Sequence, residues 1–122
     1  MENKLYVVCL VYPSSIPGDV KIGVSSNPEQ RLRTLQTGSS KLLSMEELIG
    51  DLPKNTAYSI ERTLHEVFAN IRKSGEWFDN ILLNILASIQ RGSTDIDLES
   101  LKYANISIND YTKAKIELLK SY

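Results

Sequence analysis

Two apolar segments joined by a proline- and glycine-containing loop limit what the start of this chain can fold into. The first, KLYVVCLVY (4–12), is rich in β-branched and aromatic residues, which favours a strand covered on both faces. The loop PSSIPGD (13–19) contains a Pro-Gly pair, and the short run VKIGV (20–24) follows it. The pattern predicts a β-hairpin.

A capped helix is expected directly after the hairpin. Asn27 is a favourable N-cap, Pro28 suits the first helical position, and Gln30 completes a capping-box pattern. The helix PEQRLRTLQT (28–37) is expected to stop at Gly38.

The middle of the chain predicts one more strand and one long helix. LLSMEELIGDL (42–52) can hold a third strand, although its Met, Glu and Leu content suits a helix equally well. Apolar residues with a 3.6-residue period then predict a helix capped at Asn55 or Thr56 that stops before Gly75.

The C-terminal third predicts helices. An apolar helix is expected over 81–91 and a linker over 92–95, followed by one or two amphipathic helices up to the C-terminus. We therefore expect a domain over 1–91 and a helical extension over 92–122.

Composition excludes few functions. Over 122 residues, 14 Lys and Arg against 15 Asp and Glu give a net charge of −1, which neither demands nor excludes a nucleic-acid partner. One Cys and one His cannot build a structural zinc site, which needs four ligands, and Cys9 is expected to be a buried structural thiol. No apolar stretch approaches the ~20 residues needed to span a bilayer. The N-terminus also lacks a signal-peptide pattern, so a cytoplasmic location is expected.

Four residues could together act on a phosphodiester. Tyr6 and Lys21 lie on the two predicted strands, Arg31 on the first helix and Glu61 on the long helix. An arginine and a metal ion can stabilise the negative charge of the transition state, and a carboxylate binds Mg²⁺. A tyrosine beside a lysine can have its pKa lowered and act as a general base.

Each of these residues also has an ordinary structural explanation. Tyr6 can be an amphipathic core tyrosine, and Lys21 and Arg31 can be solvated surface charges. Glu61 and His65 form an i, i+4 pair on a helix flank. Taken one at a time, these structural explanations are the more frequent ones.

Taken in order, the motifs resemble those of the GIY-YIG nuclease superfamily, and most closely its phage T5-type branch. KLY (4–6) stands where that superfamily has GIY, and KIG (21–23) stands where it has YIG. The segments KIGVSSNPEQRLRTL and ERTLHEVFANIRKSGEWF are similar to the patterns of the branch, and the resemblance covers about residues 4–85. It implies a small three-stranded antiparallel sheet flanked by helices, in a mixed α/β (α+β) fold of order β-β-α-β-α-α.

The resemblance implies a role for each matching residue. Tyr6 would be the general base, and Lys21 would ease its deprotonation. Arg31 would stabilise charge on the phosphate, and Glu61 would hold a single Mg²⁺ or Mn²⁺. His65 would orient a phosphate or a metal-bound water, or pack beside Glu61.

Further residues are assigned around this set. Asn80 lies where many family members carry an asparagine near the site, whereas Trp77 and Phe78 are expected mainly in the core. The residues expected to contact nucleic acid are Arg33, Lys41 and Arg62.

The leading expectation is a metal-dependent endonuclease that hydrolyses DNA and, as the resemblance implies, leaves 5′-phosphate ends. The alternative is a catalytically inactive nucleic-acid-binding or regulatory module of the same fold. A third possibility is a protein-interaction role for the C-terminal helices, including formation of a homodimer.

Overall fold

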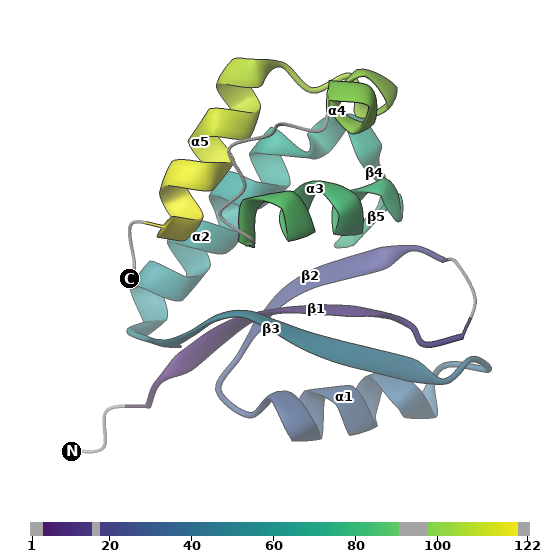
Figure 1. Cartoon of the computed structure of the whole chain (residues 1–122). Coiled ribbons are helices and arrows are strands. Elements are labelled where there is room, and N and C mark those ends of the chain that lie inside the picture. Colours follow the sequence, from purple (N-terminus) through teal and green to yellow (C-terminus); the bar gives the residue numbers. More distant parts are fainter. Residues whose placement is uncertain (1–3, 16–17, 91–97, 120–122) are drawn as a thin grey trace.

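A sheet of five antiparallel strands in the order β3-β1-β2-β5-β4 organises the computed structural model, which describes residues 4–15, 18–90 and 98–119 (Figure 1). The strands are β1 (Tyr6–Pro13), β2 (Val20–Ser25), β3 (Leu43–Leu52), β4 (Arg72–Ser74) and β5 (Trp77–Phe78). The helices are α1 (Pro28–Thr37), α2 (Lys54–Val67), α3 (Ile81–Gln90), α4 (Leu98–Ala104), α5 (Ile108–Leu119) and a 3₁₀ turn, η1 (Ala69–Ile71). The expected mixed α/β (α+β) class is confirmed, with two short strands beyond the three expected.

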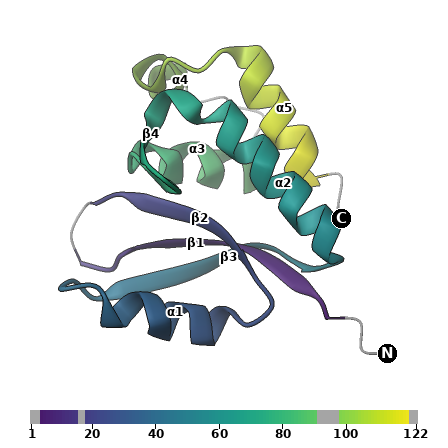
Figure 2. The same cartoon turned by 180° about the vertical axis from the view of Figure 1, so that it is seen from behind.

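The helices cover the two faces of the sheet unequally. In the part of the chain that the structure describes, α1 lies on one face, whereas α2, α3, α4 and α5 gather on the other (Figure 1 and Figure 2). α1 packs against β3 and β1 without burying any residue fully, and α2 packs against β1, β2 and α5. The main hydrophobic core therefore lies on the α2 side of the sheet.

The register of β1 against β2 assigns each side chain of the hairpin to one face. Leu10 lies opposite Ile22, and both are buried in the core on the α2 side. Val11 lies opposite Lys21, and successive side chains of a strand alternate between faces. Lys21 therefore lies on the α1 face.

The signals for α1 are confirmed. The side-chain Oδ1 of Asn27 accepts a hydrogen bond from the backbone N–H of Gln30 at 3.2 Å. Pro28 occupies the first turn, and Gly38 ends the helix. The cap fixes where α1 begins, and hence which of its side chains reach back over the sheet.

The long helix ends earlier than its sequence period predicts. α2 stops at Val67, and the chain passes through η1 into the β4–β5 hairpin, whose turn includes Gly75 at a φ of 55°. This backbone conformation suits a residue without a Cβ. The hairpin pairs with the edge of β2, with Val20 opposite Phe78, and Phe78 becomes fully buried. Strand pairing and burial override the helical period here.

Trp77 and Phe78, both expected mainly in the core, point to opposite faces of β5. Phe78 is part of the core, whereas Trp77 is partly buried and lies opposite Lys21 on the other face. The expectation is confirmed for Phe78 and wrong for Trp77, because the two-residue alternation of a strand separates neighbouring side chains.

Two other boundaries differ from the sequence-based expectation. α2 begins at Lys54 after Pro53, without a side-chain cap, and not at a cap formed by Asn55 or Thr56. The linker expected over 92–95 lies outside the described residues, and the domain division at residue 91 stays a prediction.

The C-terminal helices contribute to the core on the α2 side. Leu101, Tyr111 and Leu118 are nearly fully buried and belong to the same apolar cluster as Ile60 and Leu64 of α2. α5 packs along α2 (Figure 2). None of the described helices is long and apolar enough to cross a membrane.

Replacing Leu118 with Ala is expected to lower the free energy of unfolding by about 2–5 kcal/mol, because this side chain is 4 % exposed and its loss leaves a cavity in the core. Leu119→Ala is the matched control: Leu119 is 44 % exposed, and the expected change is below about 1 kcal/mol. Urea denaturation followed by circular dichroism measures both values. Equal losses would contradict the packing of α5 into this core.

Candidate functional site

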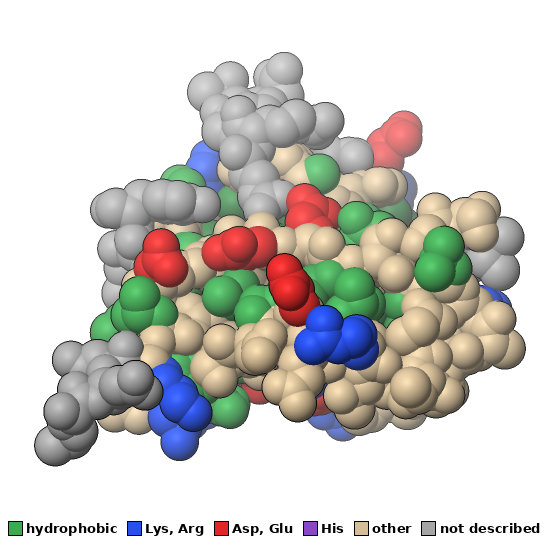
Figure 3. Space-filling view, turned by 90° about the horizontal axis from the view of Figure 1, so that it is seen from below, with side chains coloured by type: hydrophobic (Ala, Val, Ile, Leu, Met, Phe, Trp, Pro, Cys, Tyr) green, Lys and Arg blue, Asp and Glu red, His purple; other side chains and the backbone are tan. Residues whose placement is uncertain are grey.

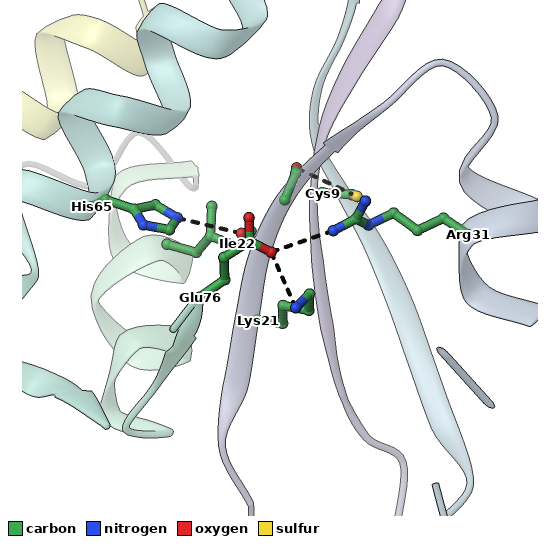
Figure 4. Close-up of polar contacts among 7 residues, drawn as sticks. Cys9, Lys21, Ile22, Arg31, His65 and Glu76 are labelled. Carbon is green, nitrogen blue, oxygen red and sulfur yellow. Dashed lines mark hydrogen bonds and ion pairs between the residues drawn. The ribbon is translucent and has the colours of Figure 1, made fainter. Parts of the chain in front are cut away.

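Polar groups gather where the edge of β2 extends beyond its short pairing with β5. β5 pairs with β2 at Val20 and Lys21. At Ile22 the backbone N–H donates to the Glu76 carbonyl at 3.3 Å, and the carbonyl oxygen lies 3.4 Å from Nε2 of His65 (Figure 4). The β4–β5 turn and α2 therefore both reach this stretch of β2.

Glu76 joins two cations that come from different elements. Its Oε2 lies 3.0 Å from Nζ of Lys21 on β2 and 3.4 Å from Nη2 of Arg31 on α1 (Figure 4). The side chain of Lys21 is 14 % exposed, that of Arg31 29 % and that of Glu76 39 %. The two cations thus converge on one anionic oxygen at the protein surface.

The guanidinium of Arg31 lies against the backbone of Gly23. A Cβ added at Gly23 would lie 2.8 Å from Nη2 of Arg31, closer than real Cβ atoms pack, and 3.2 Å from its Cζ and Nε. Gly23 lies within β2 and not in a turn, so its role here is to let the arginine approach. Nε of Arg31 is buried and has no hydrogen-bond partner among the described residues, which leaves one directed donor for a further acceptor.

α2 supplies Glu61 and His65, one helical turn apart. Burial raises the pKa of the Glu61 carboxyl, and the negative charge of Glu76 raises it further. His65, Arg31 and Lys21 act in the opposite direction on the same pKa. A carboxylate in this setting gains stability from an added cation.

His65 faces the site and also packs against the core residue Phe78. Its ring meets Phe78 edge to face, with the ring centroids 5.0 Å apart and the planes at 86°. Because a carbonyl oxygen can only accept, the hydrogen bond to Ile22 requires that Nε2 of His65 carries the hydrogen. Of the two roles expected for His65, packing has direct contacts in its favour.

Tyr6 is not part of this cluster. The register places Val11 opposite Lys21, five positions along β1 from Tyr6, and the two residues lie on opposite faces of the sheet. The ring of Tyr6 packs near Tyr58 of α2, with centroids 6.3 Å apart. The expectation that Tyr6 lies beside Lys21, which would ease its deprotonation, is therefore wrong.

Cys9 lies on the site face of β1, two residues before Val11, which takes the place opposite Lys21. It lies opposite Gly23, and its Sγ donates to the Gly23 carbonyl at 3.6 Å. Burial raises the pKa of the thiol against the opposing effect of Arg31. Since the thiolate is the reactive form, Cys9 is a structural thiol, as expected.

The remaining expected residues lie outside the Lys21–Glu76–Arg31 contacts. Asn80 begins the turn into α3 and lines a separate pocket of about 320 Å³ with Tyr12 and Gly18. The exposed cations expected to contact nucleic acid are Arg33 on α1, Lys41 in the α1–β3 loop and Arg62 on α2.

A metal ion at this site would depend on few protein ligands. In the described ranges, no group of three or more His, Cys, Asp or Glu side chains could hold a metal ion. Glu61 and Glu76 are the carboxylates whose charges act on each other. This donor set fits Mg²⁺ or Mn²⁺, which retain water and take oxygen ligands from a bound phosphate.

Glu76 is the site residue that the sequence analysis did not assign. It belongs to the GEWF segment, which was used there only as part of a resemblance. The available signal was its place after Ser74-Gly75, because a Ser-Gly pair marks a turn. Such a turn projects the next side chain from the end of the hairpin.

Comparison with known protein families gives a match over most of the chain. The T5orf172 domain matches residues 6–91, a span that includes Lys21, Arg31, Glu61 and Glu76. No curated protein and no solved structure matches the chain. This domain is found in GIY-YIG-like, phage nuclease-related proteins. Because the match covers well over half of its residues, the chain belongs to the T5orf172 domain family.

Proposed function

We propose that this chain is a metal-dependent endonuclease that hydrolyses phosphodiester bonds in DNA. The observation that carries the proposal is the convergence of Lys21 and Arg31 on a single carboxylate oxygen of Glu76. Two cations arranged to share one anionic oxygen can equally share a non-bridging oxygen of a phosphate. Glu76 therefore marks where the scissile phosphate would bind.

Arg31 offers more than the contact that Glu76 uses. Its Nη2 is paired, whereas its buried Nε–H has no acceptor among the described residues. A phosphate presents two oxygens on one edge, which matches two parallel N–H donors of a guanidinium, and Lys21 adds a compact charge. A phosphate at this point would satisfy a donor that the carboxylate leaves open.

Glu61, with Glu76 near it, would hold the divalent cation. The pKa of Glu61 is raised by burial and by the charge of Glu76, and a Mg²⁺ or Mn²⁺ ion would offset both effects. Such an ion, when bound, lowers the pKa of its water and neutralises charge on the phosphate. Lys21 and Arg31 would then hold the phosphate in position and stabilise its developing negative charge.

A second candidate function is nucleic-acid binding without turnover. Its specific support is the position of Tyr6 on the other face of the sheet, which separates the expected general base from Lys21. The charge distribution also favours it, since a backbone-binding surface is usually continuously basic. On the face in Figure 3, Lys and Arg side chains lie apart from one another and among Asp and Glu side chains.

Purified protein is expected to nick supercoiled plasmid in Mg²⁺ or Mn²⁺ and to stop when EDTA is added. Glu61→Gln is expected to reduce the nicking rate at least about 100-fold, because it removes the charge that would hold the ion. Glu66→Gln, at an exposed position on the same helix, makes the same charge change and should leave the rate nearly unaltered. Metal-independent nicking, or equal rates for the two variants, would refute this site. Binding without nicking would establish the second candidate.

The raised pKa of Glu61 predicts a pH-dependent stability. The folded state holds a proton on Glu61 above the usual pKa of 4.5, so ionisation of this carboxyl costs stability: the cost grows as the pH rises from 4.5 to the folded-state pKa and is constant above it. In EDTA at pH 7, Glu61→Gln is therefore expected to raise the melting temperature, and the difference should vanish as the pH falls below 4.5.

Differential scanning fluorimetry across pH measures this effect. Added Mn²⁺ should raise the melting temperature of the wild type and leave that of the variant unchanged. A lower melting temperature for Glu61→Gln at pH 7 would contradict the proposed electrostatics.

Removing the charge of Glu76 is expected to strengthen DNA binding in EDTA. Glu76→Gln weakens two partly exposed ion pairs that a phosphate must replace, which predicts a gain of about 2- to 10-fold in affinity. Glu66→Gln is the charge-matched control and should change the affinity by less than about 2-fold. Fluorescence anisotropy at fixed salt measures both. A weaker complex for Glu76→Gln would show that Glu76 positions the cations instead of occupying the phosphate site.

A further inference from the structure

A polar pocket is lined by Trp77, the residue whose ring contacts Lys21 of the candidate site. It is an open hollow of about 400 Å³ between the α1–β3 loop and the β4–β5 hairpin. Its walls include Trp77, Lys41, Ser39, Ser74 and Asp19. The mixture of one large aromatic ring with hydroxyl and charged groups suits a flat, polar ligand such as a nucleobase.

Trp77 connects this pocket to the phosphate position. It is paired directly with Lys21 across β5 and β2, and Nζ of Lys21 lies 5.2 Å from the centroid of the indole. The same ammonium lies 3.0 Å from Oε2 of Glu76. A ligand in the pocket is thus one side chain away from a phosphate held by Lys21 and Arg31.

Packing in the hydrophobic core does not explain the position of Trp77. Its neighbour Phe78 is fully buried on the α2 side, whereas Trp77 lies partly exposed on the α1 side and outside the apolar cluster. A partly exposed indole beside a cationic group is the usual arrangement for stacking against bases of a single strand. In a duplex both faces of a base are already covered by its neighbours, so the indole can stack only on an unpaired base.

We propose that this pocket binds one unpaired nucleotide adjacent to the phosphate held by Lys21 and Arg31, with its base stacked on Trp77. The inference rests on the proposed function and narrows it to DNA that contains unpaired nucleotides. Lys41, which also lines the pocket, would contact the backbone of the same strand.

The chain provides its own probe, because Trp77 is its one tryptophan. Oligo(dT) and an abasic oligonucleotide of equal length carry the same phosphates and differ only in their bases. In EDTA, so that no strand is cut, saturating oligo(dT) is expected to quench the indole fluorescence. We expect oligo(dT) to bind about 5- to 100-fold more tightly than the abasic strand. A duplex of equal length should quench weakly.

Variants separate stacking from folding. Trp77→Leu is expected to bind oligo(dT) no better than the abasic strand, whereas Trp77→Phe should retain part of the preference. Leu42→Ala alters a 67 % exposed residue of the same loop that does not line the pocket, and should leave the preference unchanged. Circular dichroism melting of each variant tests whether it is folded. If Trp77→Leu does not fold, Trp77→Phe tests the proposal instead.

Equal affinity for oligo(dT) and the abasic strand would overturn the inference. Saturation without quenching, an unchanged preference in Trp77→Leu, or no binding of either strand would also overturn it. These results are independent of cleavage. A base preference through Trp77 in a protein that never nicks DNA would support the subsite and refute the endonuclease; nicking without a base preference would do the reverse.

Discussion

Strand β2 divides its side chains between two environments, and both the core and the candidate site depend on that division. Ile22 points into the apolar cluster under α2, while Lys21 and Gly23 point to the α1 face. A shift of one residue in register would exchange the two sets, burying the lysine charge and exposing the isoleucine. The free energy of burying the apolar set therefore holds the cation on the side where Arg31 approaches.

The β4–β5 hairpin contributes one side chain to the core and another to the candidate site. Phe78 enters the core and fixes the hairpin against β2, and the turn after Gly75 then places Glu76 between Lys21 and Arg31. This carboxylate neutralises the cations and also raises the pKa of Glu61. The carboxylates of Glu61 and Glu76 repel each other, and a bound metal ion would reduce that repulsion. A bound phosphate would in turn pair with Lys21 and Arg31, and these two effects are the physical basis of the proposed function.

Local sequence signals predicted the strands and the helix that are determined by residues close together in the sequence. The two apolar runs became β1 and β2, and Asn27, Pro28 and Gly38 set the ends of α1 as expected. The third strand was confirmed although its composition suited a helix equally well. The helical period failed after Val67, where pairing with the β2 edge replaced a continuing helix. Such pairing joins segments distant in sequence, and periodicity within one segment carries no information about it.

By itself, the sequence determined the hairpin, the capped helix and the presence of Lys21, Arg31 and Glu61 at spacings that resemble a nuclease. The tertiary structure alone decided which side chains meet. It separated Tyr6 from Lys21, because the register of β1 depends on core packing and not on the motif letters. It also brought Glu76 to the two cations and turned Trp77 away from the core. The two-residue turn and the alternation of β5 determine these positions only after the hairpin has paired with β2.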